Sequence, residues 1–327
     1  MKAIVQHCYG GPEQLRLEDL RTPEPAADQV LIRVHAASVN AYDWHVMRGD
    51  PRLARVAMSR PRGQARGRDV AGIVEAVGTE IGDLAVGDRV YGDLGESEGA
   101  FAEYAVARRG CVDRMPAGLT FEQAAALPLA ATTALMGLRD AAETAPGQRV
   151  LVNGASGGVG TFAVQIAKAL GAHVTGVCSA RNAELVTALG ADEVIDYTRT
   201  DATRTGASYD VVLDLVGNHS LRSLRRVLAP GGVVVLSGGG VFQGGSLAGP
   251  MALIVKAKLV APFIHDRVVV LETAPSASHL AALRDLVESG YLSPAIDRTF
   301  PLVDTPAAIS YLEQEHARAK VIISVLG

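Results

Sequence analysis

A strand, a glycine-rich turn and a helix follow one another at residues 149–169, and this succession restricts the possible folds more than any other segment. The apolar run Val150–Val152 leads into a stretch of small residues at 154–160. After the turn, apolar residues recur at helical spacing: Phe162, Val164, Ile166, Ala167 and Leu170. Glycines permit the sharp turn and let a ligand and the strand come close to the main chain.

The turn predicts a binding site for the pyrophosphate of a dinucleotide. The first N–H groups of a helix are unpaired, and the helix dipole favours negative charge beside them. A glycine-rich stretch is also typical of an ordinary loop, but the flanking strand and helix provide the context that a dinucleotide site requires. We therefore expect cofactor contacts from Gly154, Ser156, Gly157, Gly158 and Val159.

The composition is typical of a globular protein with about two domains. Of the 327 residues, 48% are hydrophobic and 20% charged, and the formal net charge of -4 favours neither nucleic acid nor an anionic membrane. Cys8, Cys111 and Cys178 are too far apart for a metal motif or a disulfide framework, which indicates a reducing cytoplasm. The first ten residues indicate a strand rather than a signal peptide.

Short apolar runs separated by Gly and Pro occupy residues 1–120 and predict a partly open β-barrel or a sandwich. The expected strands are Ala3–Gln6, Leu15–Leu17, Gln29–Ala36, Asp69–Val77, Asp88–Tyr91 and Phe101–Val106.

From Glu122, Ala-rich helical segments alternate with six β-branched runs, a pattern that predicts a doubly wound parallel sheet. After Glu272 a helix, a strand-like stretch and a final apolar strand could complete the first domain. The six runs are Val150–Val152, Val174–Val177, Glu193–Tyr197, Val211–Leu215, Gly232–Leu236 and Val268–Leu271, and the later elements are His279–Ser289, Ala295–Phe300 and Val321–Val325.

Over nearly its whole length the chain resembles medium-chain dehydrogenases/reductases of the zinc-independent, quinone-oxidoreductase-like branch. The resemblance implies a GroES-like catalytic domain of residues 1–122 and 273–327, with a Rossmann domain of residues 123–272 between them. The matching segments are SVNAYDWHVMRGDP (38–51), GRDVAGIVEAVG (67–78), VGDRVYG (86–92), GAFAEYAV (99–106), LPLAATTAL (127–135), the glycine turn, LGADEVIDY (189–197) and HARAKVIISV (316–325).

The residues after the second Rossmann strand indicate NADP(H) rather than NAD(H). An acid that binds the adenosine ribose is expected about 20 residues past the glycines. The strand His173–Cys178 is instead followed by Ser179 and Arg181, and the nearest carboxylate, Glu184, lies on the next helix. A hydroxyl and a guanidinium suit a 2′-phosphate. In the alternative reading, both residues only cap a helix and face water.

The resemblance implies further cofactor contacts around the Rossmann sheet and near the chain's end. Each of these residues has an alternative reading as a helix cap, a turn or a surface residue. They are Thr133 near the nicotinamide, Tyr197 on the adenosine side, Ser237 and Gly238 at the carboxyl edge of the sheet, and His316, Ala317 and Arg318 in the C-terminal segment.

The positions that bind catalytic zinc in zinc-dependent relatives carry other residues here. The early cysteine is replaced within the segment 40–43, and the Gly-His-Glu motif reads Gly67-Arg68-Asp69. An arginine cannot ligate a cation, and catalytic zinc needs three protein ligands. The four-cysteine lobe of many relatives is absent as well, and His35, His45 and Asp43 have no definite metal spacing. We therefore expect no zinc.

Without zinc, the resemblance implies hydride transfer to a quinone or an activated double bond, whose developing charge needs only hydrogen bonds and a proton. We expect Asn40 to donate its amide to the substrate carbonyl or to the ribose. Tyr42 is either a proton donor specific to a subgroup or a packing residue. Asp43 is expected to brace the loop, Trp44 to pack, and His45 to be structural or solvent-facing.

Seven arginines between Arg48 and Arg68 could steer NADPH or an anionic substrate, or simply form a solvated surface. The segment lacks the interleaved aromatics that nucleic-acid binding would need.

Three functions remain open: an NADPH-dependent quinone or enone reductase, which leads; an enoyl reductase of a secondary-metabolite pathway; and a non-catalytic NADPH-binding protein. The resemblance implies a homodimer, with Val268–Leu271 as a candidate edge strand.

Overall fold

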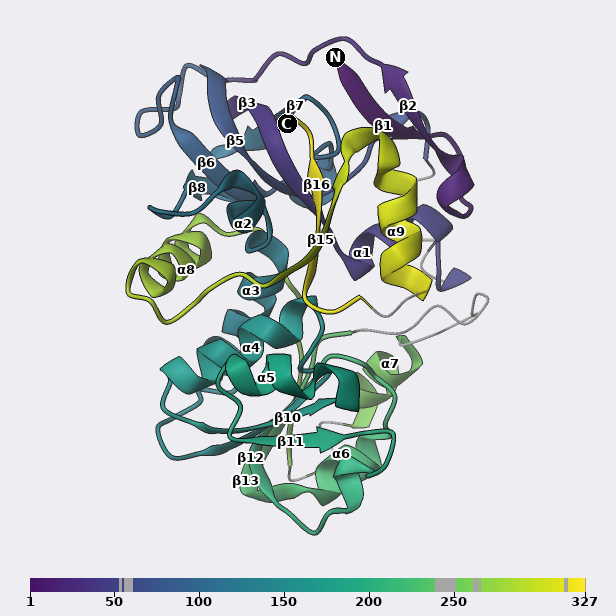
Figure 1. The fold of residues 1–327 in the computed structure, drawn as a ribbon, viewed down its shortest axis with the longest axis vertical. Coiled ribbons are helices and arrows are strands. Elements are labelled where there is room, and N and C mark those ends of the chain that lie inside the picture. Colours follow the sequence, from purple (N-terminus) through teal and green to yellow (C-terminus); the bar gives the residue numbers. More distant parts are fainter. Residues whose placement is uncertain are drawn as a thin grey trace. The chain divides into compact units, whose positions relative to one another are not determined.

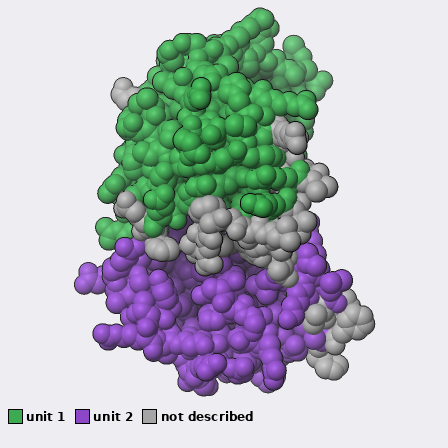
Figure 2. All heavy atoms as spheres, turned by 90° about the vertical axis from the view of Figure 1, so that its right-hand side faces the viewer, with its two compact units in different colours: residues 1–132, 274–327 green, residues 133–273 purple. Residues whose placement is uncertain are grey.

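The computed structural model describes residues 1–52, 55, 61–238, 251–260, 264, 266–314 and 317–326. They form two compact units, drawn as ribbons in Figure 1 and coloured separately in Figure 2. Unit 1 comprises residues 1–132 and 274–327, and unit 2 comprises residues 133–273, so unit 2 is inserted between two segments of unit 1. The first boundary lies beyond the expected residue 122 because α2 (Phe121–Ala125) packs on the main sheet of unit 1.

Unit 1 is built on two sheets. The larger has seven strands in the order β15-β16-β3-β5-β6-β8, with β7 also paired to β3, and the smaller has the order β2-β1-β4. The strands are β1 (Lys2–Gln6), β2 (Leu15–Asp19), β3 (Gln29–Val39), β4 (Gln64–Ala65), β5 (Asp69–Val77), β6 (Arg89–Asp93), β7 (Tyr104–Arg108), β8 (Val112–Arg114), β15 (Ile296–Pro301) and β16 (Lys320–Ser324).

The end of the chain returns to the centre of the larger sheet. Strand β16 pairs antiparallel with β3, with Val321 opposite Val39, and β15 adds to β16 in parallel. The side chains of β3 and β16 are mostly buried. Residues 1–132 and 274–327 therefore contribute strands to the same sheet.

Four further helices belong wholly or partly to unit 1: α1 (Ala41–Arg48), α3 (Pro128–Leu135), α8 (Ala277–Glu288) and α9 (Thr305–Gln314). Specific polar contacts hold α8 and α9 in place. The Tyr91 hydroxyl of β6 donates to the Leu280 carbonyl of α8 at 2.6 Å. Arg48 of α1 donates through Nη2 to Glu313 of α9, also at 2.6 Å.

Unit 2 is a six-stranded parallel sheet in the order β11-β10-β9-β12-β13-β14, and it confirms the expected doubly wound sheet. Leu151, Val212 and Val234 lie in its hydrophobic core together with Leu224 of α6 and Ala257 of α7. The elements are β9 (Arg149–Asn153), α4 (Gly158–Ala169), β10 (His173–Cys178), α5 (Ala183–Ala188), β11 (Glu193–Asp196), β12 (Tyr209–Asp214), α6 (Leu221–Arg226), β13 (Leu228–Leu236), α7 (Met251–Val260) and β14 (Arg267–Val270).

No helix among the described residues combines the length and the apolar character needed to cross a lipid bilayer.

Candidate active site

The glycine turn joins β9 to α4 as expected, and its geometry leaves no room for side chains at two positions. Gly154 has a φ of +90°, and its N–H and that of Ala155 both donate to the Val177 carbonyl of β10. A Cβ added at Gly160 would lie 2.0 Å from the Gly154 carbonyl oxygen. The turn after β9 and the helix α4 therefore pack against each other through backbone atoms, with no side chain between them.

The N-terminus of α4 is open to an anion. Gly157 is the N-cap residue, and no side chain caps the helix there. Gly157, Gly158 and Val159 are half-buried rather than enclosed. Unpaired N–H groups beside a glycine cradle fit a pyrophosphate, so the residues present fit the cofactor that the turn predicts.

The topology places this turn where ligands bind in doubly wound sheets. The strand order reverses between β10 and β12, with β9 at the crossover, and ligands lie at the carboxyl ends of strands flanking such a reversal. At that edge Asn153 donates to Asp214 at 2.8 Å and to Asn218 at 2.9 Å. No sequence pattern indicates this trio, because it forms only when β9 and β12 pair as neighbouring strands.

The residues expected at the 2′-phosphate follow β10 directly. Ser179 is half-buried and makes no capping hydrogen bond, although it is the residue before a 3₁₀ turn, and Arg181 is exposed. The buried Asn182 donates to Ser156 Oγ at 3.0 Å. This bond, which sequence analysis missed, ties the segment after β10 to the glycine turn.

The remaining cofactor candidates are dispersed. Tyr197 follows β11 and is 55% exposed. The Ser237 N–H donates to the Asp214 carbonyl at the carboxyl edge of the sheet, and Gly238 follows with a φ of +74°. Thr133 is buried in α3. In unit 1, Arg318 is bound to Asp297, while His316 lies outside the described residues.

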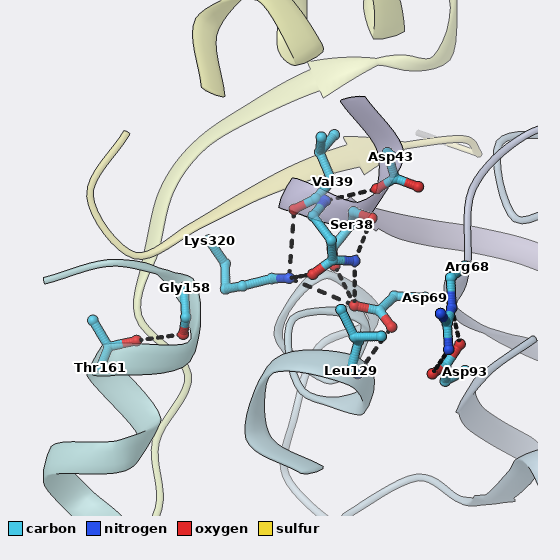
Figure 3. Close-up of polar contacts among 11 residues, drawn as sticks. Ser38, Val39, Asp43, Arg68, Asp69, Asp93, Leu129, Gly158, Thr161 and Lys320 are labelled. Carbon is cyan, nitrogen blue, oxygen red and sulfur yellow. Dashed lines mark hydrogen bonds and ion pairs between the residues drawn. The ribbon is translucent and has the colours of Figure 1, made fainter. Parts of the chain in front are cut away.

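Asn40 lies in a buried polar network with Ser38, Asp69 and Lys320, the three of these residues that Figure 3 labels. Its amide nitrogen donates to Asp69 Oδ2 at 2.9 Å and to the Ser38 carbonyl at 3.4 Å, and its Oδ1 accepts from Lys320 at 2.6 Å. Both amide hydrogens are therefore used within unit 1. Donation to a substrate would require one of them to leave its partner, and that role stays a prediction.

Lys320 and Asp69 are the charged pair at the centre of this network, with Nζ and Oδ2 3.5 Å apart. Their residues are 2% and 0% exposed. Asp69 also accepts from Ser38 Oγ at 2.8 Å and from the Leu129 N–H at 3.0 Å. Burial lowers the pKa of Lys320, while the charges of Asp69 and Asp43 oppose that shift.

Tyr42, on the first turn of α1, presents its ring to the Arg68 guanidinium, 4.5 Å from the ring centroid. Arg68 is itself held by Asp93 through two hydrogen bonds of 2.8 and 2.6 Å. Burial, and then the charge of Glu98, raises the pKa of Tyr42 above its ordinary 10.0. The phenol therefore keeps its proton at neutral pH and is available as a proton donor.

Asp43 braces the start of α1, as expected. Its Oδ2 accepts from the Asn40 N–H at 2.7 Å, and burial raises its pKa to about 7. Trp44 is buried and its ring stacks on His45, whose Nδ1 lies 2.8 Å from the Asp50 carbonyl.

The described residues contain no group of three His, Cys, Asp or Glu side chains able to hold a metal ion. Within that part of the chain the three cysteines are free thiols. Arg68, at the position of the metal-binding histidine, is committed to Asp93.

Two family models match the chain. The model described as an alcohol dehydrogenase GroES-like domain matches residues 26–117, and the model described as a zinc-binding dehydrogenase matches residues 189–323.

Full-length relatives and a solved structure match as well. The chain is 35% identical to the chloroplastic NADPH-dependent alkenal/one oxidoreductase of Arabidopsis thaliana, over 99% of this chain and 79% of that protein. It is 32% identical to the chloroplastic quinone-oxidoreductase homolog of Spinacia oleracea, over 99% and 98% of the two chains. The quinone oxidoreductase structure from Coxiella burnetii has a TM-score of 0.86 and 33% identity, with 100% and 99% covered.

The chain belongs to the medium-chain dehydrogenase/reductase family, in the branch that contains the quinone oxidoreductases.

The close approach at Gly160 makes a direct prediction. Gly160→Ala places a methyl group against the Gly154 carbonyl, so β9 and α4 must separate. We expect the free energy of unfolding to fall by about 1–3 kcal/mol and binding of NADPH to be lost, measured by urea unfolding and by nucleotide fluorescence. Gly157→Ala is the control for stability, because its added Cβ would lie 3.4 Å from the same oxygen. Equal stability of the two variants would contradict the prediction.

Proposed function

We propose that this protein is an NADPH-dependent reductase that transfers a hydride to a quinone or an α,β-unsaturated carbonyl compound without zinc. The observation that carries the proposal is the glycine turn at the crossover of the parallel sheet, followed by Ser179 and Arg181 in place of an acid. The names of the relatives from Arabidopsis thaliana and Spinacia oleracea support the same chemistry.

The residues of each unit have separate tasks in this proposal. The N-terminus of α4 binds the pyrophosphate, and Ser179 and Arg181 bind the 2′-phosphate. NADPH, when bound, supplies the hydride. Tyr42 donates a proton to the oxygen or carbon that becomes negatively charged when the hydride adds, and Arg68 keeps the phenol ring in place. The charge of Arg68 at the histidine position is the observation that favours a zinc-free site. Stoichiometric zinc in the purified protein would contradict that part.

A substrate screen tests the proposal. NADPH oxidation is followed with quinones, simple enones and enoyl thioesters. Turnover of quinones or enones supports the proposed function. Turnover confined to enoyl thioesters would indicate the pathway enoyl reductase, and tight NADPH binding without any turnover would indicate a non-catalytic protein.

Arg181→Ala tests the cofactor preference. We expect the KM for NADPH to rise about 10- to 100-fold, because a charge-assisted hydrogen bond to phosphate contributes roughly 1.5–3 kcal/mol. The KM for NADH, which lacks that phosphate, should stay unchanged. The control is Arg199→Ala, whose side chain is exposed and faces Asp196. A wild type that prefers NADH would overturn the assignment.

A homodimer and a cytoplasmic location are part of the proposal. Strand β14 lies at the edge of the described six-stranded sheet. An exposed apolar edge strand tends to pair with another chain, so a second subunit covering β14 would be favourable. A monomer in sedimentation velocity would contradict the dimer. The free thiols of Cys8, Cys111 and Cys178 favour a reducing compartment, which cell fractionation tests.

A further inference from the structure

A second buried ion pair, Arg66–Glu98, lies in unit 1 outside the network of Asn40. The side chains of Arg66 and Glu98 are only 6% and 7% exposed, and Arg66 Nη1 contacts Glu98 Oε2. Two more polar atoms of the pair, Arg66 Nη2 and Glu98 Oε1, are buried without a hydrogen-bond partner. Leaving a buried donor and acceptor unpaired costs free energy, so stabilisation of the fold alone does not account for this pair.

The backbone at Glu98 is strained. Its φ is +51° and its ψ is −166°, in a region that side-chain-bearing residues rarely adopt. The turn that carries it contains Gly95 and Gly99, both with positive φ, and Glu98 is the only residue of 95–99 that has both a side chain and a positive φ. Such conformations cost free energy and cluster at functional sites.

Glu98 interacts electrostatically with the proposed proton donor. Its charge raises the pKa of Tyr42 and, after burial, that of Asp43. Burial raises the pKa of Glu98 itself to about 7, against the charges of Arg66 and Arg68. The Asp43 carboxyl also leaves Oδ1 buried and unpartnered. The charged and titratable groups around Glu98 are therefore Arg66 and Arg68 beside β5, and Tyr42 and Asp43 on α1.

The Tyr42 hydroxyl makes no hydrogen bond to a residue that the structure describes, since its interactions are those of its ring and of these charges. It can therefore release its proton without breaking a hydrogen bond to a described residue. Each turnover would leave a phenolate, which must recover a proton before the next.

We propose that Glu98 is the proton reservoir for Tyr42, connected to it through a water molecule held by Glu98 Oε1 and Arg66 Nη2. Such a water satisfies both unpartnered atoms. It accepts from Arg66 Nη2, and it accepts from Glu98 Oε1 when the carboxyl is protonated and donates to it when the carboxyl is ionised. Glu98 touches neither substrate nor cofactor, so it is a positioning residue. This role rests on the proposed reductase function.

The proton balance is simple. After hydride addition to the β-carbon, the enolate takes the Tyr42 proton, breaking the O–H bond and forming a C–H or O–H bond on the product. The phenolate takes a proton from the Glu98 carboxyl through the water. The resulting carboxylate stays paired with Arg66 and takes its next proton from solvent. For a quinone, the quinol oxygen replaces the enolate.

The test compares Glu98→Gln with Glu96→Gln, a change at an exposed residue of the same turn. Glutamine keeps an oxygen that can accept from Arg66 but cannot give up a proton. At pH 6.5 we expect kcat of Glu98→Gln to fall at least about tenfold, with the KM for NADPH unchanged and a larger solvent isotope effect. The wild-type kcat should decline as pH rises through about 7, where Glu98 ionises, and this decline should disappear in Glu98→Gln.

A second readout needs no turnover. Because the pKa of Glu98 is raised from 4.5 to about 7, its contribution to stability is complete below 4.5 and is lost as pH rises to about 7. Between pH 5 and 8, Glu98→Gln should therefore lose less stability than wild type. If Glu98→Gln fails to fold, Glu98→Asp replaces it and should retain the decline in kcat with pH.

Combining Tyr42→Phe with Glu98→Gln gives a double-mutant cycle. In that background Glu98→Gln should have no further effect on kcat, because the two residues act in series. If the wild type is active and Glu98→Gln shares its kcat and pH profile, the reservoir role is wrong and the proposed function stands. If the wild type reduces none of the acceptors, both the reservoir role and the proposed function are wrong.

Discussion

Lys320→Met is expected to lower the free energy of unfolding by about 3–5 kcal/mol, because it leaves a buried carboxylate without its cation. Methionine keeps the apolar part of the side chain, so the loss is mainly electrostatic. Asp69 and Asn40 both lose a partner within hydrogen-bonding range. Asp69 would then tend to bind a proton, so the variant should be less unstable at low pH.

Urea unfolding followed by Trp44 fluorescence measures this effect within unit 1, since Trp44 is the only tryptophan of the chain and is buried in α1. Lys2→Met is the matched control. It removes a lysine from an ion pair whose side chains are 50% and 73% exposed, and should cost far less stability, because solvent screens an exposed pair. Adding Asp69→Asn to Lys320→Met should restore most of the stability. Similar losses of stability for Lys320→Met and Lys2→Met would show that the buried ion pair stabilises the protein no more than the exposed one does.

Tyr42→Phe is expected to lower kcat by about 100-fold, because positioned proton transfer contributes factors of this order. The ring remains against Arg68, and the lost hydroxyl has no hydrogen bond to a described residue, so stability and NADPH affinity should be retained. Steady-state kinetics with an enone acceptor measure the effect.

Tyr91→Phe supplies the contrast. Its hydroxyl donates to the Leu280 carbonyl, so this variant should lose stability and keep kcat. An unchanged kcat in Tyr42→Phe would assign the proton to solvent and make Tyr42 a packing residue, the second of the two readings that the sequence leaves open.

Local patterns predicted unit 2 well, because each βα step is short and carries its own signal. Strand β10 occupies the expected residues 173–178, and the glycine turn lies where its composition indicated. Strand β13 starts at Leu228, earlier than the expected Gly232, since the pattern of apolar residues before it is interrupted by Pro and Gly. The β-strand β8 and the two-residue β4 were not predicted, because each is too short to show a period.

The polar networks could not be predicted, because the residues that form them lie far apart in the sequence. Asn40 and Lys320 are 280 positions apart, and their contact exists only after β16 pairs with β3. The sequence predicts that Asn40 donates its amide to the substrate carbonyl or the ribose, and it does not indicate the hydrogen bond that this amide donates to Asp69. No motif or periodicity in the sequence indicated a role for Glu98. Its burial and its backbone conformation come from a turn whose importance the sequence does not reveal.

The insertion of unit 2 into unit 1 also dictates the order in which the protein can mature during synthesis. Every strand of the parallel sheet has been synthesised before residue 296 is made, so unit 2 can fold early. The seven-stranded sheet must wait for β16, and until then Asp69 has no lysine beside it. A nascent chain that stalls before residue 320 would expose an unfinished sheet edge, which is the part of this protein that we expect chaperones to bind.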